Sequence, residues 1–146
     1  MKLEKSSIAS LGKTKQRKTE VISTMSKRDL LEAAARASGM LWSHDPEITH
    51  DGLWIVSPTM HTCWDPLTTD QDAFFLMVKL GISVMPYPVY ALDKHSVVAK
   101  RYQSMDVMRD KNPTEIVEVY GSDPAAATRR AIVRCAAAIW EVKQPV

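Results

Sequence analysis

The chain has 146 residues, of which 45% are hydrophobic and 25% charged, and these values are typical of one globular domain. They exclude a chain that is disordered throughout. No apolar run approaches the roughly 18 residues that a membrane span requires, so we expect no membrane partner.

The two cysteines, Cys63 and Cys135, are far apart in the sequence, and the first 24 residues contain no apolar segment of the kind found in secretory signals. A reducing cytoplasm with both thiols free is therefore the expected compartment, and one disulfide is the alternative.

Positive charge is concentrated at the N-terminus. Residues 1–24 contain six basic and two acidic side chains, a balance of +4, which leaves −2 for the remainder. We predict a flexible basic arm over 1–24 and a folded domain over 25–146, with Met25 as an alternative initiator. Such an arm suits nucleic-acid phosphates, although a solvated tail is the simpler interpretation.

The first predicted helix covers residues 27–38, where Ser26 is the N-cap and Gly39 the stop. Three short strands are expected after it, at 40–42, 53–56 and 61–64.

The second predicted helix covers residues 70–80, with Thr68 or Thr69 as its cap and Gly81 at its end. Its composition is apolar nearly all round, so it is either buried on all sides or buried on one side and bound to a partner on the other. We assign Phe74, Met77 and Val78 to the core and leave Phe75, Leu76 and Lys79 as the flank that could meet a partner.

The C-terminal half alternates strand and helix. Strands are expected at 82–85 and 89–92, where Pro86 and Pro88 indicate an edge strand or a bend, and at 115–120; residues 96–108 are ambiguous. The last helix should cover 124–142 with Asp123 as N-cap. Its inner face is predicted to contain Ala125, Thr128, Ile132, Val133, Ala136, Ile139 and Trp140, and Arg130, Arg134 and Glu141 should point away. The predicted fold is α+β, a small antiparallel sheet with about three helices packed on it in two layers.

Two segments carry a resemblance. Residues 63–82, CWDPLTTDQDAFFLMVKLGI, and residues 123–138, DPAAATRRAIVRCAAA, resemble segments of uncharacterised accessory proteins of phages and prophages, and their arrangement is loosely similar to that of the NinX group. The resemblance implies a small protein in the cytoplasm of a bacterial host, acting on a host protein, with residues 1–24 outside the usual domain.

The residues that could bind a metal ion or act in catalysis do not match the spacing of a known motif. His44, His50, His61 and Cys63 lie close together in sequence but match no zinc pattern, so we expect neither metal nor cofactor. Cys63 is a poor nucleophile candidate because the acidic helix start would oppose a thiolate. The carboxylates of Asp65, Asp70 and Asp72 suit either magnesium or, more simply, the start of a helix.

Three groups of residues are candidate binding surfaces. A pocket lined by Trp42, Trp54, Trp64 and Arg129 could stack a nucleobase. The flank of Phe75, Leu76 and Lys79 suits a protein partner, and so does the face with Arg130 and Arg134. We therefore expect a non-enzymatic binding module or inhibitor, with a homo-oligomer allowed. The alternatives are a sponge for a nucleotide signal and a nucleic-acid-binding protein that uses the basic arm.

Overall fold

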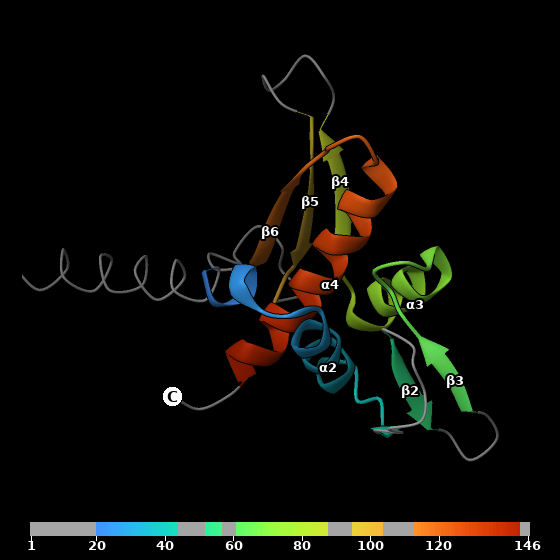
Figure 1. Ribbon diagram of the computed structural model, residues 1–146. Coiled ribbons are helices and arrows are strands. Elements are labelled where there is room, and N and C mark those ends of the chain that lie inside the picture. Colours follow the sequence, from blue (N-terminus) through green and yellow to red (C-terminus); the bar gives the residue numbers. More distant parts are fainter. Residues whose placement is uncertain (1–19, 44–51, 57–60, 88–94, 104–112, 144–146) are drawn as a thin grey trace, which may run out of the picture.

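The computed structural model describes residues 20–43, 52–56, 61–87, 95–103 and 113–143. Three principal helices and six strands follow in the order α2 (Lys27–Ala37), β1 (Trp42–Ser43), β2 (Leu53–Val56), β3 (His61–Trp64), α3 (Asp70–Leu80), β4 (Ser83–Tyr87), β5 (Ser96–Arg101), β6 (Thr114–Val119) and α4 (Pro124–Lys143). The α+β class is confirmed. The prediction of a single sheet was wrong, because the described strands form two antiparallel three-stranded sheets, β1-β2-β3 and β4-β5-β6 (Figure 1).

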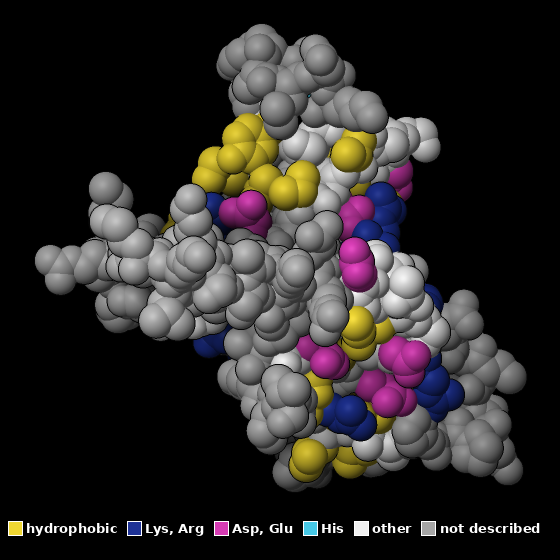
Figure 2. Space-filling view, turned by 90° about the vertical axis from the view of Figure 1, so that its left-hand side faces the viewer, with side chains coloured by type: hydrophobic (Ala, Val, Ile, Leu, Met, Phe, Trp, Pro, Cys, Tyr) yellow, Lys and Arg dark blue, Asp and Glu magenta, His cyan; other side chains and the backbone are white. Residues whose placement is uncertain are grey.

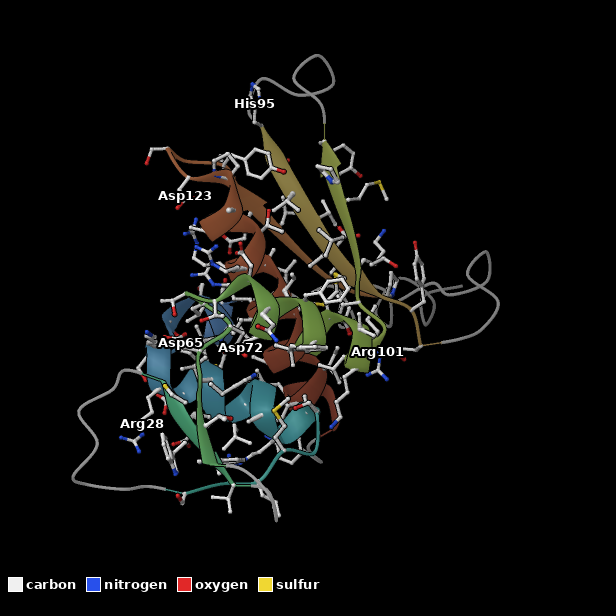
Figure 3. All side chains as sticks on the ribbon, turned by 90° about the vertical axis from the view of Figure 1, so that its right-hand side faces the viewer. Arg28, Asp65, Asp72, His95, Arg101 and Asp123 are labelled. Atoms are coloured by element: carbon white, nitrogen blue, oxygen red, sulfur yellow. The ribbon has the colours of Figure 1, made fainter. Side chains whose placement is uncertain are left out.

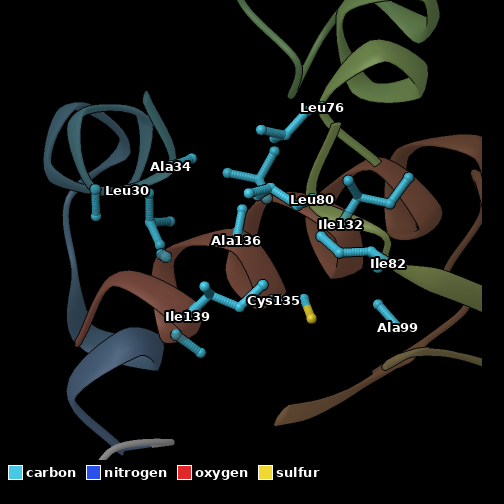
Figure 4. Close-up of a cluster of buried hydrophobic side chains, with 14 of the residues drawn as sticks. Leu30, Ala34, Leu76, Leu80, Ile82, Ala99, Ile132, Cys135, Ala136 and Ile139 are labelled. Atoms are coloured by element: carbon cyan, nitrogen blue, oxygen red, sulfur yellow. The ribbon is translucent and has the colours of Figure 1, made fainter. Parts of the chain in front are cut away.

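Helix α4 is the centre of the molecule. It packs against β5 and β6 of one sheet and against α2 and α3, so it connects otherwise separate parts (Figure 1). Its alanines at 131, 136 and 137 are fully buried, and such small side chains let neighbouring helices approach closely. Figure 4 shows Leu30 and Ala34 of α2 and Leu76 and Leu80 of α3 converging on this helix.

The helix ends follow the local signals in the sequence. Ser26 Oγ accepts a hydrogen bond from the Asp29 backbone N–H at 3.1 Å, which confirms the predicted N-cap of α2. Asp123 Oδ1 accepts from the Ala126 N–H at 3.0 Å at the start of α4. Gly39 and Gly81 stop their helices with φ of 73° and 64°, a backbone region that favours glycine.

Strand β4 is an edge strand, as its proline predicts. The Tyr120 N–H donates to the His95 carbonyl at 2.8 Å, and ladder bonds alternate along antiparallel strands. Val97 therefore directs its backbone groups to β6, and Pro86, which lies opposite Val97, has its nitrogen at the free edge. No ladder bond is lost. The strand expected at 89–92 lies outside the described residues, and 96–101 proves to be strand.

The smaller sheet contains one position that only glycine fits. A Cβ atom at Gly52 would lie 2.8 Å from the Trp64 carbonyl oxygen and 2.9 Å from Cys63 Sγ. Both distances are shorter than a real contact allows, so glycine lets β2 begin directly against the end of β3.

The packed part of the chain begins earlier than predicted. Residues 20–24 are helical, and Ile22 is only 1% exposed and belongs to the main core. Residues 20–24 therefore belong to the folded domain and not to the predicted arm. Charge misled the prediction, because the basic side chains all precede residue 19 whereas the apolar Val21 and Ile22 follow it.

Candidate functional site

Helix α3 has two apolar faces, and the structure buries the one that contains Leu76, a residue that the sequence pattern assigned to the partner side. Leu76 is fully buried, with Ala73 and Leu80, whereas Phe74 is 56% and Val78 59% exposed. The core assignment of Phe74 and Val78 was therefore wrong, and so was the exposed flank assigned to Leu76. Phe75, at 55% exposed, is where the prediction placed it.

The exposed side of α3 is here called the α3 outer face. It consists of three apolar side chains, Phe74, Phe75 and Val78, and of the exposed polar Gln71. At about 100° per residue, these four side chains lie within one arc, opposite the buried face. The Phe74 and Phe75 rings meet edge to face, with centroids 6.1 Å apart. Lys79 is exposed beside them, at the C-terminal end.

A turn built around Asp65 holds the start of α3. The Asp65 N–H donates to Asp72 Oδ2 at 2.9 Å, and the Asp65 carboxylate accepts from the Leu67 N–H at 3.1 Å and from Lys27 Nζ at 2.7 Å. Asp65 and Asp72 lie side by side in Figure 3. Thr69 is the N-cap residue, but its side chain makes no cap bond, so the turn at Asp65 replaces the predicted threonine cap.

Arg129 joins this turn to α4. Its Nε donates to the Leu67 carbonyl at 2.9 Å and its Nη1 pairs with Asp70 Oδ1 at 2.5 Å. Only 15% of its side chain is exposed. Arg129 therefore connects the start of α3 to α4, and its Nε and Nη1 donors are directed at the protein rather than at a ligand.

The three aspartates each have a separate partner. Asp65 pairs with Lys27, Asp70 with Arg129, and Asp72 accepts the Asp65 N–H. Within the described ranges, no three His, Cys, Asp or Glu side chains lie close enough to hold a metal ion. His44 and His50 lie outside those ranges.

Cys63 has an environment that disfavours its thiolate. Partial burial raises the pKa of the Cys63 thiol, and the carboxylates of Asp65 and Asp72 raise it further, against the opposing effect of Lys27. The predicted opposition between the acidic helix start and a thiolate agrees with this direction.

The tryptophans do not form the predicted pocket. Trp64 is 5% exposed and lies opposite Leu53, on one face of its sheet. Trp54 follows Leu53 on β2, so its side chain lies on the other face of the sheet, opposite Cys63. Trp42 instead stacks with Arg36 of α2, whose guanidinium carbon is 5.3 Å from the ring centroid.

Arg130 and Arg134 do not simply point away from the protein. Both approach the carboxylate of Glu118 on β6, Arg134 through Nη1 and Arg130 through Nε at 3.6 Å. Glu118 is only 9% exposed, so the two guanidinium groups satisfy a buried charge between helix and sheet.

A second apolar surface covers the side of β4–β6 that faces away from α4. Met85, Val117 and Val119 are each at least half exposed there, and Figure 2 shows hydrophobic side chains gathered near the top of the molecule. The 2.8 Å ion pair between Lys100 and Glu115 shares that face. The aromatic α3 outer face is therefore the better candidate, because phenylalanine provides more apolar contact area.

The α3 outer face has the size of a binding hot spot rather than of a whole interface. Taking about 200 Å² for an exposed phenylalanine, its apolar part is roughly 300 Å², the lower limit for the largest patch on a monomer. A standard interface needs roughly 800 Å² on each partner.

No described helix is long and apolar enough to cross a membrane. Comparison of the chain with protein-family models, curated proteins and solved structures finds no match.

Proposed function

We propose that the chain is a non-enzymatic protein-binding module and that the α3 outer face is its contact surface. The observation that carries the proposal is the exposure of Phe74, Phe75 and Val78 on a helix whose other face is fully buried. Exposed aromatic side chains at adjacent helical positions are typical anchors for an apolar groove on a partner.

The rigidity of α3 supports this proposal. The buried side chains of Leu76 and Leu80 hold the helix along its inner face, and the turn at Asp65 and the contacts of Arg129 hold its N-terminal end. A helix held in this way loses little conformational entropy on binding, which favours affinity from a small surface.

The partner that fits has an apolar groove about two helical turns long. We take this partner to be a protein of a bacterial host, as the resemblance to phage accessory proteins implies. A role without catalysis is favoured because Asp65, Asp70, Asp72 and Arg129, which were candidates for chemistry, make contacts that position α3.

The test places a photo-crosslinking amino acid at Gln71, which is exposed within the α3 outer face. We expect a crosslinked adduct with one host protein in bacterial lysate. The adduct should disappear with Phe75→Ser and persist with Leu41→Ser, which removes an apolar side chain that is 74% exposed outside α3.

Both variants should keep the melting temperature within a few degrees because both side chains are largely exposed. An adduct that is unaffected by Phe75→Ser, or equally weakened by Leu41→Ser, would contradict the proposal. So would the lack of any adduct with a host protein.

A further inference from the structure

We propose that the free edge of β6 is a second binding site, which takes an extended segment of a partner protein as a further strand of the β4-β5-β6 sheet. The site is separate from the α3 outer face, because α4 lies between β6 and α3 (Figure 1). It binds main-chain hydrogen-bonding groups, whereas the α3 outer face offers side chains.

The ladder between β5 and β6 determines which backbone groups of β6 are free. The hydrogen bond from the Tyr120 N–H to the His95 carbonyl fixes the alternation, so every second residue before Tyr120 directs its N–H and C=O groups to β5. The residues between them are Glu115, Val117 and Val119, and their backbone groups point out of the sheet. Among the described strands, none pairs with that edge. The free edge therefore offers alternating donors and acceptors, which an extended main chain complements.

The two edges of this sheet differ in their protection against a further strand. At the β4 edge, Pro86 has no N–H to donate to a neighbouring strand. Strand β6 contains no proline over its six residues, and its pairing with β5 runs without a bulge from Thr114 to Val119. The β6 edge can therefore accept a strand along its whole length, and the β4 edge cannot.

The side chains at the free edge are those of a strand that lacks one neighbour. Val117 is 55% and Val119 50% exposed, whereas Val98, which lies opposite Val117 on the middle strand, is 6% exposed. An added strand would place side chains beside both valines, as β5 does on their other side. Apolar β-branched residues at alternate positions of the segment fit these two places.

A second copy of β6 does not fit this edge as an antiparallel neighbour. In the register with the longest overlap, the two Val117 residues lie opposite each other, and Glu115 of each copy faces the apolar Val119 of the other. On the α4 side, Ile116 then falls opposite Glu118. The next register places the two Glu118 side chains opposite each other, where like charges destabilise the pair. The occupant is therefore a segment of different sequence, with a polar residue opposite Glu115.

A synthetic peptide with blocked ends, Lys-Thr-Val-Thr-Val-Thr-Lys, is the probe, and the full chain is the protein. Its two valines match Val119 and Val117 in an antiparallel pairing, and its last lysine then lies opposite Glu115. We expect the peptide to slow hydrogen exchange of these three amides, measured residue by residue by NMR, because each gains an acceptor.

N-methylated peptides provide the matched controls without changing the protein. Methylation of the two valine nitrogens removes the donors that face β6, so this peptide should bind about tenfold more weakly or worse. Methylation of the two outer threonine nitrogens, which face away from β6, should leave binding nearly unchanged. Equal binding of both methylated peptides would overturn the proposal.

A proline variant tests the same edge from the side of the protein. Val117→Pro removes an N–H at the free edge and spares the ladder to β5, so the chain should fold and lose the peptide. Phe75→Ser, on the α3 outer face, should bind the peptide as the wild type does, which separates this site from the proposed contact surface. Unchanged exchange of the three amides at millimolar peptide would contradict the proposal. So would slowed exchange in concentrated protein without peptide, because a second copy would then be the occupant.

Discussion

Leu76 and Phe74 are two positions apart on one helix, yet they lie in opposite environments. Leu76 is fully buried against the core, whereas Phe74 is 56% exposed and contacts Phe75. Hydrophobicity alone would have placed the larger aromatic side chain inside. Their difference in burial, rather than their size, should therefore determine what each contributes to stability.

The first prediction compares truncation at these two positions. Leu76→Ala should lower the free energy of unfolding by about 3 kcal/mol, because it removes buried methyl groups and leaves a cavity. Phe74→Ala should lower it by less than about 1 kcal/mol, since its side chain is already in solvent. Urea unfolding of both variants measures the difference. Equal losses would mean that the outer face of α3 is packed as tightly as the inner one.

Helix limits could be predicted from the sequence, and helix orientation could not. The sequence placed the second helix at residues 70–80, as α3 has it, and the first helix within one residue of α2. Both limits depend on local signals, such as Ser26 and the stop glycines. The facing of α3 depends on α4, which lies more than forty residues further along the chain, and an apolar pattern on both sides cannot indicate which side α4 covers.

The candidate surface was accordingly found in part. Phe75 was identified because it lies about 100° from the predicted core face and proved exposed. Leu76 was assigned to the exposed flank, and Phe74 and Val78 to the core, because the sequence does not indicate which apolar side of the helix α4 covers. The predicted tryptophan pocket failed on sheet register, since Trp54 alternates to the opposite face from Trp64. Register follows from long-range pairing, which single residues do not reveal.

The second prediction concerns the connection between α3 and α4. Arg129 is 15% exposed and bonds to the Leu67 carbonyl, whereas Asp70 is 80% exposed. Solvent screens the ion pair, so Asp70→Asn should cost less than about 1 kcal/mol. Arg129→Met keeps most of the aliphatic stem but leaves the Leu67 carbonyl without its donor, which should cost about 1–3 kcal/mol.

Thermal unfolding ranks the two variants, and hydrogen exchange locates the effect. Amides at the start of α3 should lose more protection in Arg129→Met than amides in β5. A larger loss of stability in Asp70→Asn than in Arg129→Met would show that the ion pair, and not the carbonyl contact, holds the two helices together.

At the scale of the whole molecule, α4 lies in one core that both sheets share, packing directly on β5 and β6 and, through α2, next to the first sheet. Its fully buried residues Ala131, Val133, Ala136 and Ala137 belong to the same core as Leu53 of the first sheet and Val97 of the second. The two sheets share no strand, so this common core connects them. Ile22 extends the same core towards the N-terminus.

The third prediction concerns where the cooperative unit begins. Removal of residues 1–24 also removes Ile22, which is 1% exposed and packed in the core, whereas removal of residues 1–19 keeps it. The shorter chain should therefore lose about 2–4 kcal/mol more free energy of unfolding than the longer one, the usual cost of deleting a buried isoleucine side chain. Ile22→Ala in the full chain is the matched control and should reproduce most of this loss, and Val21→Ala, at a position that is 50% exposed, should not. Urea unfolding gives all four values. If both truncated chains were equally stable, the burial of Ile22 would contribute nothing, and the domain would begin at Met25 as its charge pattern first indicated.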